Sequence, residues 1–510
     1  MAHSILNDVL GPVMRGPSSS HTAAAYHIGK TILPLLETTP SRVVVTFDPR
    51  GSYAQTYRQQ NADKSFAAAL AGWALTDERF EQALEAVAAQ GWELVFRTAP
   101  IDEADHPNYM RIALEGGDRP LVVDAKSTGG GTFVVCRIAG GACAIDGKRY
   151  ACVVFADAHW TPPDGEWTCL ASADRASAGE SVWLGEFVEP IDPEAFADSP
   201  HVHRVVAIPP VYAVPRGPVW FESASQAAET ALRENLTLGT LGCRYEAALL
   251  AADEADVRDE MKRRLGVMRA SVEQGLAGEG LRLKLLEPCA GEVFRGCSQP
   301  GAALGGMPSK AAARAMAVMH VANSAGVICA APTGGSAGVL PGVLETLREM
   351  LDLDDDRLVD AAFAAGVVGL IVANRATFAA EVAGCQVEIG AAGAMAAAAS
   401  VEAVGGTAEQ ALAAAAVSLR NTMGWPCDLV LGRCEIPCHT RNAAAAAGAL
   451  VCADLVLFGY RNPIPLDETI DASLAVGTSL PAELRCTSRG GLAIVPSVER
   501  LAARETQGGY

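Results

Sequence analysis

The hydrophobic and polar positions divide the chain into a first part with short β-type runs and a second part with helical patterns. In the first part, four apolar runs rich in β-branched residues predict strands: 43–47, 121–123, 132–135 and 151–155. The stretch 66–89 is rich in alanine and contains no proline, so we predict a helix there. This mixture predicts an α/β module over residues 1–190.

Residues 191–220 interrupt both patterns. Pro209, Pro210, Pro215 and Pro218 fall close together there, and proline punctuates regular structure. The sequence therefore predicts a connector over 191–220 between two domains.

Helical patterns continue almost throughout from Ser223. Ser223 and Ser225 are candidate N-caps for a helix over 226–235, and 253–273 predicts a charged amphipathic helix. The next predicted helices are rich in small residues that let helix backbones approach closely: 309–324 and 390–401. We therefore predict an all-helical domain over 221–510, and the α+β multidomain class for the whole chain.

Composition and charge narrow the possible partners. The chain has 510 residues, of which 50% are hydrophobic and 19% charged, so a large core is expected. Its net charge of −19 and the absence of a basic patch disfavour nucleic acid as a partner. The longest apolar run, 361–373, is too short to span a bilayer and predicts a buried helix, so no membrane association is expected.

The N-terminus lacks a basic and apolar secretory signal, so a cytoplasmic location is expected. In a reducing compartment the 14 cysteines would be thiols or metal ligands and not disulfides. Three of them, Cys385, Cys427 and Cys438, lie at or near a Gly or Pro break, 42 and 11 residues apart. By spacing alone they form neither a compact ferredoxin run nor a paired zinc motif, and any one alone is better explained as a buried packing thiol.

The residues around these cysteines add information. Gly-Cys-Gln-x-Glu contains Cys385, Cys-Asp contains Cys427, and Pro-Cys-x-x-Arg-Asn-Ala contains Cys438. Four polar or glycine-rich motifs precede them: Gly16-Pro17-Ser18-Ser19-Ser20-His21-Thr22, His106-Pro107-Asn108-Tyr109-Met110-Arg111, Ser127-Thr128-Gly129-Gly130-Gly131 and Ala330-Ala331-Pro332-Thr333-Gly334-Gly335-Ser336-Ala337-Gly338-Val339-Leu340-Pro341. Alone, the serine motif and the three glycines are each typical of a turn.

Taken in order, these motifs resemble the bacterial iron–sulfur L-serine dehydratases, in the single-chain form whose β region precedes its α region. The resemblance covers nearly the whole chain. It implies a small α/β substrate-binding module, an all-helical α region that holds the cluster, and a homodimer. It also implies a small hydroxy or amino acid as substrate, L-serine or a related compound.

In this family three cysteines hold a [4Fe-4S] cluster and leave one iron without a cysteine from that set. That iron can act as a Lewis acid toward the substrate's carboxylate and β-hydroxyl, while a protein base removes the α-proton. For serine, the products are pyruvate and ammonia. The resemblance therefore assigns the cluster to Cys385, Cys427 and Cys438.

The other roles follow from the same resemblance. His21 and His106 are the candidates for proton transfer, because imidazole titrates near neutrality, and Arg111 suits recognition of a carboxylate. The candidate substrate-binding residues supply hydroxyl, amide, carboxylate or backbone groups: Ser18, Ser19, Ser20, Thr22, Asn61, Asp63, Asn108, Gly129, Gly130, Thr333, Gly334 and Ser336.

Two departures from the family pattern leave parts of this assignment open. Gln60 stands where the family has a histidine, and an amide cannot take a proton near neutral pH, so the base and the substrate are both undetermined. Some single-chain members end in a cysteine that reaches the free iron, whereas this chain ends Gln507-Gly508-Gly509-Tyr510. The fourth iron site is then either open, or reached by Cys434 or Cys486.

Two other functions compete with a dehydratase. A non-catalytic iron–sulfur redox sensor or ligand-binding relative is favoured by Gln60 and opposed by the retained His21, His106, Asn108 and Arg111. A cysteine-rich zinc protein is disfavoured, because zinc ligands are normally spaced more closely.

Overall fold

The computed structural model describes residues 2–36, 42–115, 121–163, 165–170, 179–297, 299 and 305–506. The chain forms two compact units. Unit 1 contains Met1–Ser20, Gly129–Gly131 and Gly217–Tyr510, and unit 2 contains His21–Thr128 and Thr132–Arg216. The first 20 residues, which the sequence placed in the N-terminal module, thus belong with the helical part of the chain.

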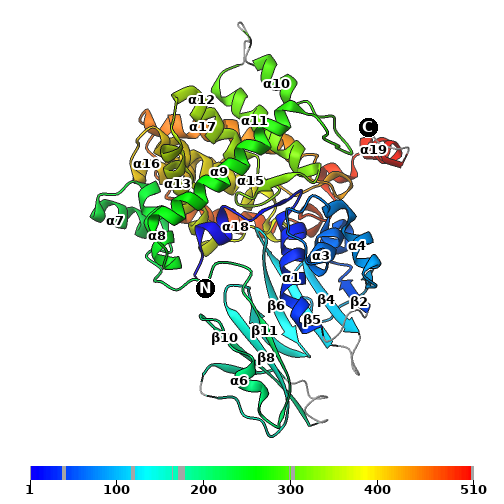
Figure 1. Ribbon diagram of the computed structural model, residues 1–510. Helices are drawn as coiled ribbons and strands as arrows, with labels where there is room; N and C mark the ends of the chain where they lie inside the picture. The colour runs from blue at the N-terminus through cyan, green and yellow to red at the C-terminus, as the bar shows by residue number, and fades with distance from the viewer. Residues whose placement is uncertain are drawn as a thin grey trace. The chain divides into compact units, whose positions relative to one another are not determined.

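Unit 2 is built on two β-sheets (Figure 1). The larger has the strand order β3-β2-β4-β5-β6-β7, in which only the β2–β3 pair is parallel among the pairings described. The smaller has the order β11-β8-β10-β9. Their bounds are β2 (Arg42–Phe47), β3 (Glu93–Thr98), β4 (Tyr109–Glu115), β5 (Leu121–Gly129), β6 (Thr132–Ile138), β7 (Gly141–Ile145), β8 (Tyr150–Asp157), β9 (Trp167–Cys169), β10 (Glu180–Phe187) and β11 (Val202–Ile208). All four strands predicted from the sequence are present.

Short helices accompany these sheets, and α1, α3 and α4 lie together along the larger one (Figure 1). They are α1 (Ala24–Ile32), α2 (Tyr53–Thr56), α3 (Ala62–Leu70), α4 (Ala83–Ala89) and α6 (Glu194–Ala197). The single helix predicted over 66–89 is wrong. The structure ends α3 at Leu70 because Gly72 adopts a left-handed conformation, φ +73°, and the Trp73 N–H bonds back to the Ala68 carbonyl.

The stretch 191–220 is more structured than a connector. It contributes α6 and β11, and β11 pairs with β8 along most of its length. The prolines that suggested a linker lie just after the strand, where Pro209 follows Ile208. A strand at a sheet edge followed by proline gives the same local sequence pattern as a linker.

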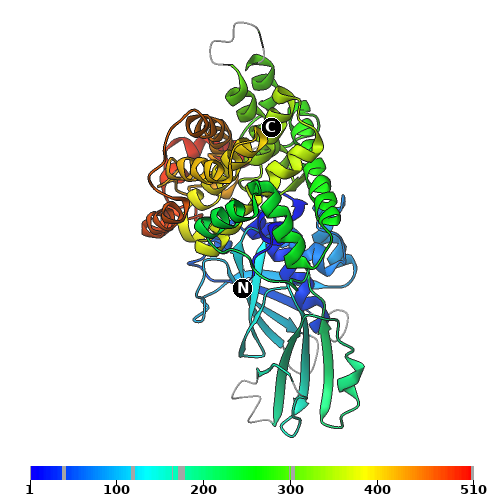
Figure 2. The same ribbon diagram turned by 90° about the vertical axis from the view of Figure 1, so that its left-hand side faces the viewer.

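Unit 1 is mainly helical, as predicted, and its helices form a packed bundle (Figures 1 and 2). One small sheet pairs β1 (Val13–Arg15) with β12 (Val327–Cys329). The described helices are α7 (Ala224–Glu234), α8 (Leu238–Leu250), α9 (Glu254–Ala277), α10 (Ala290–Cys297), α11 (Met307–Asn323), α12 (Val339–Leu351), α13 (Asp355–Arg375), α14 (Ala380–Ala383), α15 (Ile389–Ala403), α16 (Ala408–Arg420), α17 (Cys438–Leu457), α18 (Leu466–Ser479) and α19 (Ser497–Thr506). Together with the sheets of unit 2, this confirms the α+β class.

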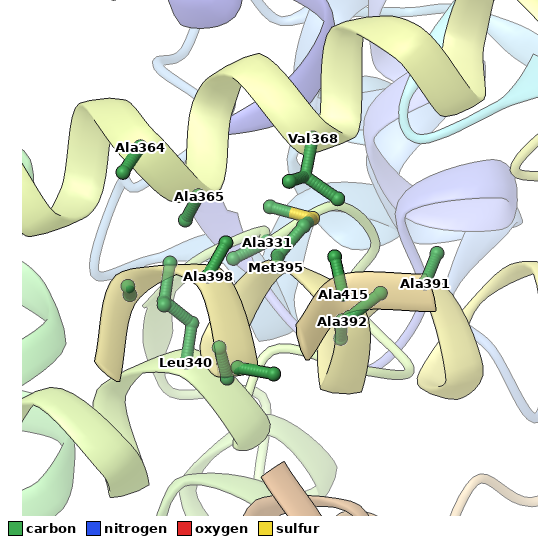
Figure 3. Close-up of a cluster of buried hydrophobic side chains, with 14 of the residues drawn as sticks. Ala331, Leu340, Ala364, Ala365, Val368, Ala391, Ala392, Met395, Ala398 and Ala415 are labelled. Atoms are coloured by element: carbon green, nitrogen blue, oxygen red, sulfur yellow. The ribbon is translucent and has the colours of Figure 1, made fainter. Parts of the chain in front are cut away.

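Small side chains allow the central helices of unit 1 to pack closely. Helix α15 is buried along nearly its whole length, and Figure 3 shows Met395 and Ala398 of α15 facing Ala365 and Val368 of α13. The predicted buried helix over 361–373 is the core of α13. Ser223 caps α7, because its hydroxyl accepts the Gln226 N–H, as the sequence indicated.

One described helix, α17, is long and apolar enough to cross a membrane by length and composition alone. Half of its apolar window is buried against other parts of the protein. A core helix passes the same test, so the finding is weak evidence for a membrane span.

The N-terminal segment is held against the helical bundle by one buried carboxylate. Glu246 of α8 is 0% exposed and accepts the N–H groups of Ile5, at 2.7 Å, and Leu6, at 3.0 Å, together with the Ser4 hydroxyl. Burial raises the pKa of Glu246 above its ordinary value. This carboxylate fixes the start of the segment that continues to Ser18–Ser20.

We expect Glu246→Ala to lower the free energy of unfolding by about 2–5 kcal/mol, because two buried N–H groups lose their acceptor. Urea unfolding of the variant and the parent protein measures the difference. Glu273→Ala, at an exposed position of α9, is the control and should change stability by less than about 0.5 kcal/mol. Equal losses in the two variants would contradict the structural role of Glu246.

Candidate functional site

Five cysteines of unit 1 gather at one buried place, which we call the thiol site: Cys385, Cys427, Cys434, Cys438 and Cys486. Their exposed fractions range from 1% to 5%. They come from three separate segments: the turn before α15, the chain that leads from α16 to the first residue of α17, and the loop after α18. The three cysteines singled out from the sequence are thus brought together with two others.

The backbone positions each of the three predicted ligands. Cys385 follows Gly384, whose φ is +76° and where a Cβ would lie 2.6 Å from the Trp425 carbonyl oxygen, so only glycine lets these segments meet. Cys427 donates its N–H to the Leu484 carbonyl at 2.7 Å. Cys438 is the first residue of α17.

Distances and electrostatics connect these groups. One ligand atom each from Cys385, Cys427 and Glu388 lies within 4.8 Å of the other two. The thiol of Cys438 interacts with that of Cys434, and Arg441 interacts with both Cys385 and Cys438. Converging thiolates are soft ligands of the kind that hold iron–sulfur clusters or zinc, so the donor set fits an iron–sulfur cluster.

Two ionisable side chains, those of Arg441 and Glu388, lie beside the thiols. The pKa of Cys385 is lowered, first by the hydrogen bond with the Cys427 thiol and then by the Arg441 cation, and this favours the thiolate form. The Arg441 guanidinium lies 3.0 Å from the Asp428 carboxylate and donates to the Pro426 carbonyl at 2.7 Å. Burial, followed by the neighbouring thiol of Cys385, raises the pKa of Glu388 well above its ordinary value, so this group favours the neutral acid.

The predicted serine motif and the predicted glycine loop also meet in unit 1. The Gly334 N–H donates to the Ser19 hydroxyl at 3.0 Å, and the Ser20 hydroxyl donates to Glu381 at 2.7 Å. Within the loop, the hydroxyls of Thr333 and Ser336 are 3.0 Å apart. The hydroxyls of Ser18 and Ser20 are 3.2 Å apart, and the side chains that make these contacts are all buried.

The glycine tip between β5 and β6 belongs to the same region. Gly129 forms a β-bridge with Phe378, and a Cβ on Gly130 would lie 3.4 Å from the Pro332 carbonyl oxygen. The predicted residues Gly129 and Gly130 therefore lie against the loop that carries Thr333 and Gly334.

Asn442 joins this loop to the thiol site. Its side-chain amide donates to the carbonyls of Gly335 and Cys438, both at 2.9 Å, and accepts the Gly338 N–H at 3.2 Å. A Cβ on Gly335 would lie 3.6 and 3.7 Å from the two Glu388 carboxyl oxygens, so Glu388 faces the loop. The Glu388 carboxyl group thus lies beside both the thiols and the loop.

The remaining predicted residues lie in unit 2. His21 is 0% exposed, and its Nε2 is 2.8 Å from the Thr56 hydroxyl. The Thr22 hydroxyl donates to the backbone carbonyl of Gln60, and the Gln60 side chain is buried. The glutamine that departs from the family pattern is therefore a buried neighbour of the predicted serine–histidine motif.

Other candidates of unit 2 lie near the start of β4 and α3. The Asn108 N–H donates to His106 Nδ1 at 3.1 Å, and the buried Asn108 side-chain amide has no hydrogen-bond partner among the described residues. Asn61 precedes α3 with a left-handed φ of 59°, and burial raises the pKa of Asp63. An unsatisfied buried amide is consistent with a ligand-binding role for Asn108.

Arg111 is engaged with its own unit. It makes two hydrogen bonds to the Asp124 carboxylate, at 2.7 and 2.8 Å, and a third contact to Glu103 at 2.9 Å. The fork of donors expected to recognise a substrate carboxylate is occupied by these two carboxylates. The bonds to Asp124 hold β4 to β5, and the predicted contact of Arg111 with substrate stays a prediction.

A pair of buried histidines, His320 and His439, packs ring to ring at 5.1 Å between α11 and α17. Burial lowers the pKa of His320 from 6.5 to about 4. Between these values the unfolded chain binds more protons than the folded chain, so this residue's contribution to stability is complete above pH 6.5 and is lost as the pH falls toward 4.

Because of His320, the free energy of unfolding should fall by about 1.4 kcal/mol for each pH unit below 6.5. Between pH 7 and pH 5 the loss should be roughly 2 kcal/mol. We expect His320→Phe to reduce the fall in urea-unfolding free energy over that interval by this amount. A pH dependence unchanged by the exchange would show that His320 is not held neutral by burial. Replacement of His203, an exposed histidine of unit 2, provides the control.

Comparison with known proteins agrees with this geometry. Residues 176–493 match the family model described as serine dehydratase alpha chain. The chain belongs to the serine dehydratase family. The match includes the whole thiol site and makes the protein an L-serine dehydratase-like lyase by family. The resemblance of residues before 176 to the family's β region stays a prediction.

Three relatives illustrate the similarity. The probable L-serine dehydratase alpha chain of Bacillus subtilis (strain 168) is 36% identical over 281 residues, which is 55% of this chain and 94% of the relative. The corresponding probable alpha chain of Latilactobacillus sakei is 45% identical over 188 residues, 37% of this chain and 90% of the relative. The L-serine dehydratase alpha chain of Peptoniphilus asaccharolyticus is 36% identical over 241 residues, 47% of this chain and 82% of the relative.

Several residues at this site were not predicted as functional. Glu388, Arg441 and Asn442 belong to the same short motifs as Cys385 and Cys438, so their place in those motifs was an available signal. Asp428 likewise follows Cys427 in the Cys-Asp motif, whereas Glu381 lacked such a signal before the structure showed its contact with Ser20. Cys434 and Cys486 were considered only as possible extra ligands, and both lie in the thiol site.

Proposed function

We propose that this protein is a [4Fe-4S]-dependent dehydratase that converts L-serine, or a closely related hydroxy amino acid, to a 2-oxo acid and ammonia. The observation that carries the proposal is the thiol site, where Cys385, Cys427 and Cys438 converge beside the half-buried carboxyl group of Glu388. These three cysteines would hold the cluster. When bound, a cluster with one iron free of these three thiolates supplies Lewis acidity toward a substrate hydroxyl and carboxylate.

The reaction balances without an external oxidant or reductant. The substrate loses its α-proton to a base and its β-hydroxyl with one proton as water, which leaves an enamine. The enamine becomes an imine, and its hydrolysis consumes one water and releases a 2-oxo acid and ammonia. The protein must therefore supply one group that accepts a proton and one that donates a proton.

Residues of unit 1 suit the donor and binding roles. Glu388 favours the neutral acid, so its carboxyl group can give a proton to a departing hydroxyl. The hydroxyls of Ser18, Ser19, Ser20, Thr333 and Ser336 and the backbone of Gly129, Gly130 and Gly334 offer hydrogen bonds to a carboxylate or an amino group. Asn442 holds the glycine loop in place beside Cys438.

The proton acceptor is proposed within unit 2, with His21 as the first candidate and His106 as the second. His21 is buried and hydrogen-bonded through Nε2 to Thr56, and His106 accepts the Asn108 N–H through Nδ1. Each contact orients an imidazole ring, the side chain that most often transfers protons in catalysis. Thr22, Asn61, Asp63 and Asn108 remain proposed substrate-binding residues, and Arg111 remains a proposed site residue.

A substrate panel tests the proposed activity. Protein purified without oxygen is incubated with L-serine, D-serine, L-threonine and non-amino hydroxy acids, and 2-oxo acid release is measured. We expect L-serine or one near relative to be converted, and His21→Asn to lose activity while keeping its iron. A protein that holds its full iron yet releases no 2-oxo acid from any compound would instead be a ligand-binding or sensing relative.

We also propose a homodimer in the cytoplasm, as the family resemblance implies. Sedimentation of the oxygen-free protein tests the dimer, and a monomer would contradict it.

A further inference from the structure

The thiol site holds more sulfur than a three-cysteine cluster needs. Besides Cys385, Cys427 and Cys438, it contains Cys434 and Cys486, both buried. The Cys486 thiol interacts with those of Cys427 and Cys434 and lies near the Glu388 carboxyl group. It therefore lies among the proposed ligands and not at their edge.

The backbone fixes Cys486 beside Cys427. The Cys427 N–H donates to the Leu484 carbonyl at 2.7 Å, and the Cys486 N–H donates to the Cys427 carbonyl at 2.8 Å. These two bonds hold residues 484–486 against the backbone of Cys427, a proposed ligand. Cys486 is also held at a φ of +59°, a left-handed conformation that is unfavourable for a residue with a Cβ.

The rest of the same loop is fixed as well. The Asp428 carboxylate accepts the Leu492 N–H at 2.9 Å, and Arg485 donates to the Val382 carbonyl at 3.0 Å. A Cβ on Gly491 would lie 2.5 Å from the Asp428 carboxyl oxygen, so the loop approaches Asp428 as closely as a glycine permits. The loop thus joins the segment of Cys427 to the segment that precedes Cys385.

Cys434 is positioned differently. It lies four residues before Cys438, its thiol interacts first with the Cys438 thiol, and its carbonyl accepts the Asn323 side-chain amide at 2.8 Å. It lacks the paired backbone contacts that Cys486 makes with a proposed ligand. This difference makes Cys434 a close control for Cys486.

We propose that Cys486 supplies a fourth sulfur ligand to the cluster in the resting protein. This inference rests on the proposed function, because it assumes the cluster. The resting site would then be closed by protein thiolates, and substrate would have to displace the Cys486 sulfur from its iron by exchanging one ligand for another. A closed site would also be protected against attack by oxygen.

The test compares the wild-type protein with Cys486→Ser and Cys434→Ser, all purified without oxygen. Iron and sulfide are measured first. Each protein is then exposed to air while its visible absorption and the electron paramagnetic resonance signal of the three-iron form are followed. We expect Cys486→Ser to lose one iron at least roughly tenfold faster than the wild type, because its fourth iron lacks a thiolate. Cys434→Ser should decay like the wild type.

Each result has a defined meaning. Equal decay of Cys486→Ser and the wild type overturns the inference, and so does faster decay of Cys434→Ser alone. If Cys486→Ser does not fold, Cys486→Gly replaces it, since glycine accepts a φ of +59° without strain. A wild-type protein without iron refutes the proposed function itself, which separates that failure from failure of the Cys486 assignment.

Discussion

Cys427→Ser is expected to abolish dehydratase activity and to leave the purified protein with far less iron. The Cys427 sulfur lies within 4.8 Å of both the Cys385 sulfur and a carboxyl oxygen of Glu388, and it also interacts with the Cys486 thiol. A serine hydroxyl keeps the size of the side chain but is a poor ligand for iron compared with a thiolate. We expect kcat/KM for the preferred substrate to fall by more than roughly 100-fold, since even replacing residues that only hydrogen-bond to metal ligands costs about 10–100-fold.

The matched control is Cys452→Ser. Cys452 is buried in α17, the helix that begins at Cys438, but its sulfur contacts the Asn421 amide at 3.6 Å and lies outside the thiol site. This exchange should keep both iron and activity. Circular dichroism of both variants checks that they fold. Full iron in Cys427→Ser, or equal loss in the two variants, would contradict the ligand assignment.

Gly334→Ala is expected to have the second largest effect. An added Cβ would lie 2.7 Å from the Ser19 nitrogen and 2.9 Å from the Pro17 carbonyl oxygen, and both are backbone atoms that cannot rotate away. The serine segment and the glycine loop must therefore separate, which breaks the hydrogen bond from Gly334 to Ser19. We expect a loss of about 1–3 kcal/mol in stability, typical of overpacking, with at least a roughly tenfold loss of activity.

The neighbouring glycine provides the control for this prediction. In Gly335→Ala the nearest atom to the new Cβ would be a Glu388 oxygen at 3.6 Å, which is an ordinary contact. We expect little change in melting temperature for this variant, and a raised KM if substrate occupies the space beside Glu388. Thermal unfolding and steady-state kinetics of both variants measure the effects. Equal melting temperatures would show that the segment at Ser19 yields more easily than the structure indicates.

Hydrophobic patterning was sufficient to predict most helices and strands. The strand over 43–47 and the helix over 253–273 appear as β2 and α9 because each satisfies its own local periodicity. The prediction failed over 66–89, where composition favoured a helix but Gly72 ends α3. It also missed β11, because a short edge strand followed by proline resembles a linker.

The site was less accessible from the sequence. The spacing of Cys385, Cys427 and Cys438 identifies no known metal motif, and only the surrounding motifs suggested that they act together. Their convergence depends on tertiary contacts, such as the bonds of Asn442 to both Gly335 and Cys438. The bond of Arg111 to Asp124 likewise depends on the pairing of β4 with β5, and Glu103 reaches Arg111 from the loop before β4, so no local pattern reveals either contact.

The most direct measurement is the iron and acid-labile sulfide content of the wild-type protein purified without oxygen. A [4Fe-4S] cluster on Cys385, Cys427 and Cys438 predicts about four iron and four sulfide per chain, in a brown protein. Zinc in place of iron, or a colourless protein that takes up neither iron nor sulfide on anaerobic reconstitution, would contradict the account.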